Sequence, residues 1–263
     1  MFHLHVPVDV ELEENPNREG FLGVDPGIRE MANCYSPTHT VATFGSKTWI
    51  KKYIWDRLLL IDRLEAKSKM VNHARRRQLK KRIARLWWKI KESVRNLQWQ
   101  TARWMCSRHS VVLMGKLKTQ ELASKVNRVL SKRSVRILYQ LSHYRFQQRL
   151  LEKGKELGCH VRLVNERLTS KRCTRCGRIH NQLGGAATFV CPNRNCGLVI
   201  HRDINAARNM LLMNLAVLRE VLESMRDTEV LRIVAEILES MNPDADEFRY
   251  PAWVLESMRN AEE

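Results

Sequence analysis

The chain has 263 residues, and 44% of them are hydrophobic, which is enough to bury a core and excludes an intrinsically disordered chain. Lys and Arg total 46 against 28 Asp and Glu, and the resulting formal net charge of +18 favours a polyanionic partner. No stretch reaches the roughly 18 apolar residues of a membrane span, and we expect no signal peptide, because the first residues lack a basic segment followed by a long apolar one.

The N-terminal part of the chain predicts three short strands after a polar leader at residues 1–19. The first strand is an apolar run that begins at Phe21, ends at Asp25 and is followed at once by a Pro-Gly turn pair. Two further strand candidates, residues 31–35 and 40–50, are separated by Ser-Pro. Three strands joined so closely favour an antiparallel meander.

A long helical segment follows. Residues 54–105 contain neither Gly nor Pro, and their apolar side chains recur at three- and four-residue steps. This spacing predicts a helical hairpin, with a break near residues 71–74. The tryptophans between positions 87 and 104 follow the apolar stripe, so we interpret them as core residues rather than as groups that stack on bases.

The positive charge is concentrated in the middle of the chain. Residues 51–182 hold 35 basic and 8 acidic residues, a net of +27, whereas the regions on either side are net acidic. A solvated surface is the ordinary explanation of a basic run, but a charge of this density favours contact with the phosphates of nucleic acid. Nuclear targeting is a second interpretation. The densest positive run consists of Arg75, Arg76, Arg77, Lys80, Lys81 and Arg82.

The remaining elements alternate between strands and helices. Residues 111–114 predict a short buried strand, and residues 132–157 predict a helix that Gly158 ends. Residues 160–166 return to a strand, and a final helix runs over residues 203–218.

The C-terminal residues change character. From residue 211 onward there are 5 basic and 12 acidic residues, and Leu-Glu-Ser-Met recurs at 222–225, 238–241 and 255–258. This spacing indicates short amphipathic helices. We interpret residues 219–263 as an acidic helical tail that either binds a protein partner or caps the domain.

Four of the seven cysteines form a cluster. Cys173-Thr-Arg-Cys176 and Cys191-Pro-Asn-Arg-Asn-Cys196 are separated by 14 residues, and a glycine follows each pair. Two such pairs joined by a short hairpin supply the four thiolates of a closed, structural zinc site, and the alternative is four incidental buried thiols. An odd cysteine count argues against a disulfide framework and for a reducing, intracellular compartment.

Two carboxylates stand at positions that suit metal binding. Asp25 ends the first strand, and Asp203 opens the final helix. Each has an ordinary explanation, since Asp25 precedes a turn and Asp203 suits a helix N-cap. A nuclease of the two-metal type, however, needs carboxylates that converge on Mg²⁺ or Mn²⁺ ions.

Four motifs together resemble a known family. They are Gly-Val-Asp-Pro-Gly at 23–27, Thr-Ser-Lys-Arg-Cys-Thr-Arg-Cys-Gly at 169–177, Cys-Gly at 196–197 and His-Arg-Asp-Ile-Asn-Ala-Ala-Arg-Asn at 201–209. In this order they resemble the C-terminal half of TnpB and Fanzor, relatives of the type V CRISPR effectors, over about residues 20–212.

The resemblance implies an architecture and an activity. It implies an α/β fold with an RNase H-like (RuvC) mixed sheet over residues 20–168, into which a helical hairpin is inserted. A target-nucleic-acid-binding zinc ribbon would occupy residues 169–200, and the last helix of the core residues 201–218. It also implies RNA-guided cleavage of DNA, so we expect DNA and a guide RNA as partners.

The family's metal-binding triad is Asp, Glu, Asp, and this chain departs from it at the middle position. Asp25 and Asp203 match the outer residues, but the position expected for the glutamate is Gly115. In one hypothesis Glu166, at the end of the neighbouring strand, takes over that role, and Glu121 is a poorer candidate. In the other, the protein is catalytically silent and only binds nucleic acid.

The resemblance also predicts where nucleic acid is contacted. Lys171, Arg172 and Arg175 give the first cysteine pair a positive charge that suits a DNA strand near the cut. Only 24 residues precede Asp25, where the family carries a long N-terminal half, so we expect an N-terminally truncated copy or a half supplied elsewhere. The expected location is the nucleus for a eukaryotic or viral protein, and otherwise the cytoplasm or nucleoid.

Overall fold

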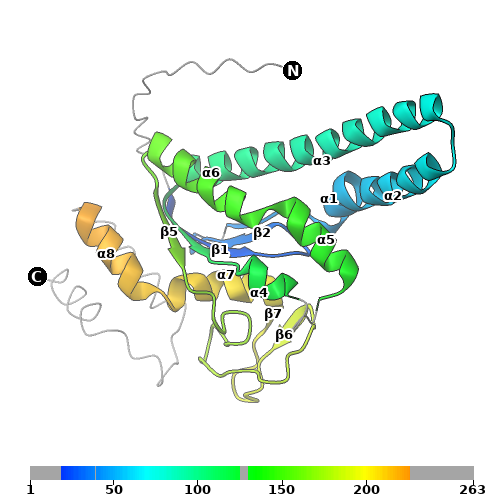
Figure 1. The fold of residues 1–263 in the computed structure, drawn as a ribbon. Helices are drawn as coiled ribbons and strands as arrows, with labels where there is room; N and C mark the ends of the chain where they lie inside the picture. Colours follow the sequence, from blue (N-terminus) through cyan, green and yellow to red (C-terminus); the bar gives the residue numbers. More distant parts are fainter. Residues whose placement is uncertain (1–18, 39, 125–129, 226–263) are drawn as a thin grey trace, which may run out of the picture.

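The computed structural model describes residues 19–38, 40–124 and 130–225 (Figure 1). Within these ranges, none of the helices is long and apolar enough to cross a membrane. Most of the predicted leader and tail, including two of the three Leu-Glu-Ser-Met repeats, lies outside the described residues.

A five-stranded mixed sheet forms the centre of the molecule, in the order β3-β2-β1-β4-β5. The antiparallel meander predicted at the N-terminus is present, because β1 pairs with β2 and β2 with β3 in opposite directions. On its other side β1 pairs parallel to β4, and β4 pairs parallel to β5. The strands are β1 (Glu19–Pro26), β2 (Ala32–Tyr35), β3 (Val41–Phe44), β4 (His109–Gly115) and β5 (His160–Val164).

The two faces of the sheet bury different side chains, because successive residues of a strand point to opposite sides. Leu22 and Val24 of β1 belong to a core shared with α2 (Asp56–Lys69), α3 (His73–Arg108), α5 (Lys132–Leu141) and α6 (His143–Glu156). Phe21, on the opposite face, belongs to a second core with α7 (Arg202–Leu212) and α8 (Leu215–Met225). The sheet is therefore a middle layer between two helical layers (Figure 1).

The predicted helical hairpin is confirmed. It consists of α2 and α3, with the break at Met70–Asn72, where the side chain of Asn72 caps α3 by accepting a hydrogen bond from the backbone of Arg75. The hairpin extends away from the sheet (Figure 1). Trp104 packs in the core against Phe44, but Trp88 is 53% exposed, so the expectation that every tryptophan here is a core residue was wrong for Trp88.

Three predicted elements differ from the structure. The strand expected over residues 40–50 ends at Phe44, because Gly45 adopts a φ of +62° and Ser46 then caps the short helix α1 (Lys47–Ile50), which continues as the π-helix η1 (Lys51–Trp55). The helix expected over 132–157 is α5 and α6, broken where Ser142 adopts a φ of +48°. The final helix is likewise two, α7 and α8.

Close packing of α7 across β1 depends on one glycine. A Cβ atom at Gly23 would lie 2.2 Å from the backbone oxygen of Ala207, so α7 approaches the strand only because position 23 has no side chain. Asp25 lies two residues further along β1 and therefore on the same, α7-facing side. This packing brings the start of α7, with Asp203, towards the end of β1.

Candidate metal centres

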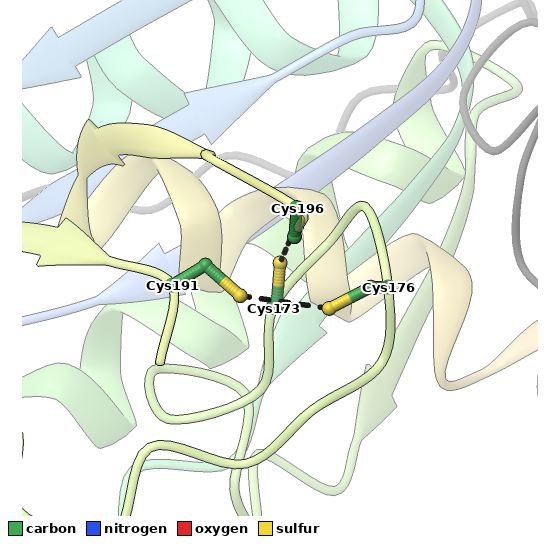
Figure 2. A group of neighbouring side chains, drawn as sticks. All are labelled: Cys173, Cys176, Cys191 and Cys196. Carbon is green, nitrogen blue, oxygen red and sulfur yellow. Dashed lines mark hydrogen bonds between the residues drawn. The ribbon is translucent and has the colours of Figure 1, made fainter. Parts of the chain in front are cut away.

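The four clustered cysteines point their sulfur atoms at one another (Figure 2). The Sγ atoms of Cys173 and Cys196 are 3.7 Å apart, those of Cys176 and Cys191 are 3.5 Å apart, and all four lie within 4.8 Å of each other. A tetrahedral zinc ion with bonds of about 2.3 Å would hold sulfurs about 3.8 Å apart, whereas a disulfide needs about 2.0 Å. The cluster therefore fits zinc, as the spacing predicted.

Local backbone geometry creates this cluster. Gly177 and Gly197, which follow the two cysteine pairs, adopt φ angles of +73° and +62°, and the backbone N–H of Arg175 donates to the Cys173 sulfur at 3.4 Å. Burial raises the pKa of the Cys173 thiol and hydrogen bonds from backbone N–H groups lower it. Between the pairs lies β6 (Thr188–Val190), which pairs with β7 (Val199–His201) just before α7.

The first two predicted carboxylates lie on the α7-facing side of the sheet. Asp25 is the penultimate residue of β1, and Asp203 is the second residue of α7. Burial raises the pKa of Asp25 well above its ordinary value, and the negative charges of Asp203 and Glu166 raise it further, while Arg202 lowers it. Asp25 is thus near enough to Asp203 and to Glu166 to be repelled by each, although the three residues are far apart in the sequence.

Glu166 lies beside Gly115, the position where the family resemblance places a glutamate. It follows β5 by two residues, and a Cβ atom at Gly115 would lie 3.0 Å from its Oε2 and 3.2 Å from its Cβ. The side chain of Glu166 therefore occupies the space that a side chain at position 115 would enter. Burial raises the pKa of Glu166 to about 7, although the positive charge of Lys118 lowers it.

This carboxylate cluster, Asp25, Glu166 and Asp203, has the chemistry of a divalent cation site. Carboxylate oxygens are the ligands that Mg²⁺ prefers, and their mutual repulsion is relieved by a bound cation. Among the described residues, only the cysteines bring three or more potential ligand atoms within 4.8 Å of one another. The three carboxylates do not meet that spacing.

Comparison with known proteins places the chain in a family. Residues 143–210, from the start of α6 to within α7, match the family model described as Cas12f1-like, TNB domain. The chain is 29% identical to the TnpB-like protein L79 of Acanthamoeba polyphaga mimivirus over 195 aligned residues. These residues cover 73% of this chain and 37% of that protein. It belongs to the TnpB/Cas12f family.

One further relative and one solved structure are similar to this chain. The CRISPR-associated endodeoxyribonuclease Cas12f1 of Sulfoacidibacillus thermotolerans is 38% identical over 82 residues, covering 30% of this chain and 19% of that protein. The solved structure of a CRISPR-Cas12f ternary complex is similar in fold, with a TM-score of 0.53 at 18% identity over 78% of this chain and 40% of that chain. The chain spans less than half the length of each of these relatives.

The basic residues singled out in this TnpB/Cas12f-family chain lie in two places. The six cations of the dense run are all exposed at the start of α3, at the distal end of the hairpin, where Arg76 also donates to the backbone oxygen of Ser68 at 2.9 Å. Beside the cysteines, Lys171 and Arg172 are half-buried, and the exposed Arg175 donates to the backbone oxygen of Cys196 at 3.0 Å.

Sequence reasoning missed the residues that fasten the cysteine-bearing segment to the sheet. Arg202 donates to the backbone oxygen of Gly184 at 2.9 Å, and Arg29 donates to that of Gly185 at 3.1 Å. Asn205 and Asn209 reach the segment from α7. Their four-residue spacing signalled that they share one helix face, but not what that face contacts. Glu121, the poorer glutamate candidate, is exposed on α4 (Thr119–Ala123) and pairs with Lys118 at 2.9 Å.

Proposed function

We propose that this chain is the catalytic part of a metal-dependent, RNA-guided DNA endonuclease of the TnpB/Fanzor type, with an RNase H-like (RuvC) core. The observation that carries the proposal is the side chain of Glu166 in the space beside Gly115, close enough to Asp25 for its charge to raise the pKa of that residue. With Asp203, this completes a set of two aspartates and one glutamate. The parallel pairing of β5 with β4 supports the same core, because it puts the end of β5 beside position 115.

Each carboxylate would hold divalent cations at the carboxyl end of the central strands. When bound, two Mg²⁺ or Mn²⁺ ions would activate the attacking water and stabilise the leaving oxygen of the phosphodiester. Arg202 balances part of the negative charge of the cluster. Because the pKa of Glu166 is about 7, this residue holds a proton in part of the molecules at neutral pH, and cation binding must displace that proton.

The remaining cations suit a nucleic-acid partner. The exposed positive residues at the distal end of α3 would contact phosphates of an RNA–DNA duplex, which proteins grip through backbone charge rather than base edges. The zinc ribbon, residues 169–200, stands directly before α7, so Lys171, Arg172 and Arg175 would contact a DNA strand near the carboxylates. The relative named as a CRISPR-associated endodeoxyribonuclease agrees with a DNA partner.

A cleavage assay tests the proposal. The full chain, with the RNA that copurifies with it, is incubated with labelled single-stranded DNA and Mg²⁺ or Mn²⁺, beside the variants Glu166→Gln and Glu121→Gln. We expect cleavage by the wild type and by Glu121→Gln, and its loss in Glu166→Gln. Equal cleavage by Glu166→Gln would refute the role of Glu166. Retention of DNA by the wild type without any cleavage would favour the catalytically silent alternative.

A further inference from the structure

We infer that Asn205 and Asn209 of α7 are positioning residues that hold Asp203 and Glu166 at their working separation and link that separation to the zinc ribbon. The inference rests on the proposed function for the role of the two carboxylates. Neither asparagine is assigned a role by the carboxylate or cysteine chemistry described above, yet both side chains are 0% exposed.

Both asparagines bind the backbone of one segment, residues 169–174. The Asn205 side chain donates to the backbone oxygen of Arg172 at 2.7 Å and accepts from the backbone N–H of Thr174 at 3.3 Å. The Asn209 side chain donates to the backbone oxygens of Thr169 at 2.8 Å and of Arg172 at 2.7 Å. The two residues lie one helical turn apart, so α7 is attached to this segment at two points along its axis.

One end of the segment is joined to Glu166. Both the backbone N–H and the hydroxyl of Thr169 donate to the backbone oxygen of Glu166, at 3.3 Å and 2.8 Å. Asp203 lies two residues before Asn205 in the same helix. A chain of short contacts therefore runs from Glu166 through Thr169 and Asn209 to the helix that bears Asp203, and it determines how far apart the two carboxylates lie.

The other end of the segment is the first cysteine pair. Asn205 binds the residues on either side of Cys173, whose sulfur belongs to the cysteine cluster. With the cysteines ligated, Arg172 and Thr174 are held in place for both asparagines. Release of the metal would free this backbone and loosen the attachment of α7, so the occupancy of the cysteine cluster is coupled to the carboxylate cluster.

The orientation of Asn209 supports a positioning role. Its amide directs both hydrogen-bond donors at the segment, whereas within the described part of the chain its buried Oδ1 has no hydrogen-bond partner. Both donors of the amide therefore act on the segment outside α7. They serve the geometry of residues 169–172.

Calorimetric titration with Mn²⁺ tests this coupling in the full chain, with and without removal of zinc by a chelator. The test variant is Asn205→Ala with Asn209→Ala. Its control is Asn214→Ala, because the half-buried Asn214 donates at 2.9 Å to Met210 of the preceding helical turn and does not reach the ribbon. Zinc content is measured for each sample, so that Mn²⁺ affinity is compared at equal zinc occupancy.

We expect the double variant to keep its zinc and to bind Mn²⁺ about tenfold or more weakly than the wild type, as is typical when groups that orient metal ligands are removed. Removing zinc should weaken Mn²⁺ binding by a similar factor in the wild type and in Asn214→Ala. In the double variant it should change the affinity by less than about twofold, because the link is already broken. The inference would be overturned if the zinc-loaded double variant bound Mn²⁺ as tightly as the wild type. It would also be overturned if removing zinc weakened Mn²⁺ binding equally in the wild type and in the double variant.

Amide hydrogen exchange supplies a second readout that needs neither Mn²⁺ nor cleavage. In the zinc-loaded double variant, and in each single variant, we expect faster exchange over residues 166–174 than in the wild type, and no change in Asn214→Ala. Unchanged exchange would contradict the attachment. If the wild type neither binds Mn²⁺ nor cuts DNA while exchange responds as expected, the proposed function fails and the attachment stands. If the wild type cuts DNA but the asparagine variants change neither Mn²⁺ affinity nor amide exchange, the attachment fails and the proposed function stands.

Discussion

The two candidate metal centres of this protein are built in opposite ways. The cysteine cluster takes its four ligands from residues 173–196, in two tight turns. The carboxylate cluster takes its three from the end of β1, the residues after β5 and the start of α7, which span positions 25 to 203. The first centre is a local property of one hairpin. The second exists only when the sheet is assembled and α7 lies across it.

Loss of zinc should have the largest effect of the changes that we propose. Cys191→Ser removes one thiolate ligand, so we expect bound zinc to fall from one ion per chain to none, residues 169–200 to become sensitive to proteases, and DNA cleavage to be lost. Metal analysis and limited proteolysis measure the first two effects. Cys159→Ser is the matched control, since Cys159 is also a buried free cysteine but lies outside the cluster. Retention of one zinc ion by Cys191→Ser would contradict a four-cysteine site.

Glu166→Gln should have the next largest effect. Mutation of residues that only orient metal ligands typically lowers metal affinity or activity by about 10–100-fold. Loss of a direct ligand should therefore slow cleavage by about a hundredfold or more. A swap sharpens the test, because Gly115→Glu combined with Glu166→Ala moves the carboxylate to the neighbouring strand. We expect the swap to recover part of the rate that Glu166→Ala loses. Gly115→Glu alone should be impaired, since its Cβ would lie 2.8 Å from the Met210 side chain as well as against Glu166.

Removal of positive charge from the hairpin should weaken binding without altering the chemistry of either metal centre. In Arg77→Ala with Lys80→Ala and Lys81→Ala, three exposed cations are lost. The slope of log affinity against log salt should become shallower by about 0.9 for each phosphate contact removed. Filter binding or anisotropy between about 50 and 200 mM salt measures this slope. Lys155→Ala, an exposed cation on α6, should leave it unchanged.

The smallest effect concerns the pH dependence of stability in the protein without divalent cations. Glu166 has a pKa of about 7 in the folded protein and about 4.3 in the unfolded chain, so between these pH values the folded state holds a proton that the unfolded state has lost. The free energy of unfolding should therefore fall as pH rises through this window. Because Glu166 is only half-buried, solvent screening limits the change to about 1–2 kcal/mol.

Urea unfolding at pH 5 and pH 7.5 measures this difference. Glu166→Gln should reduce it, while Asp25, whose pKa is also raised, should retain a change of the same sign. Saturating Mg²⁺ should reduce the loss of stability at the higher pH, because cations bind the ionised carboxylates. A pH dependence that is the same in the wild type and in Glu166→Gln would contradict the burial of that carboxyl group.

Features that depend on neighbours in the chain were predictable from the sequence. The cysteine spacing predicted the four-cysteine cluster, and the apolar period of residues 54–105 predicted the hairpin and its break. Both were predictable because the turns that hold cysteine pairs, and helices, are formed by contacts over a few residues. Short-range breaks without a sequence signal were missed. Ser142 adopts a left-handed backbone conformation that is unfavourable for most residues other than glycine. Nothing in the apolar pattern around Ser142 indicated that α5 would end there.

Only the tertiary structure decided which glutamate lies beside Gly115. The sequence left Glu166 and Glu121 as candidates for a missing glutamate, and the pairing of β4 with β5 places the first beside Gly115 while the second pairs with Lys118 in solvent. The close approach of α7 at Gly23, and its attachment through Asn205 and Asn209, likewise join residues more than 30 positions apart. Such contacts depend on the packing of elements that are distant in the sequence, so the local spacing of residues does not predict them.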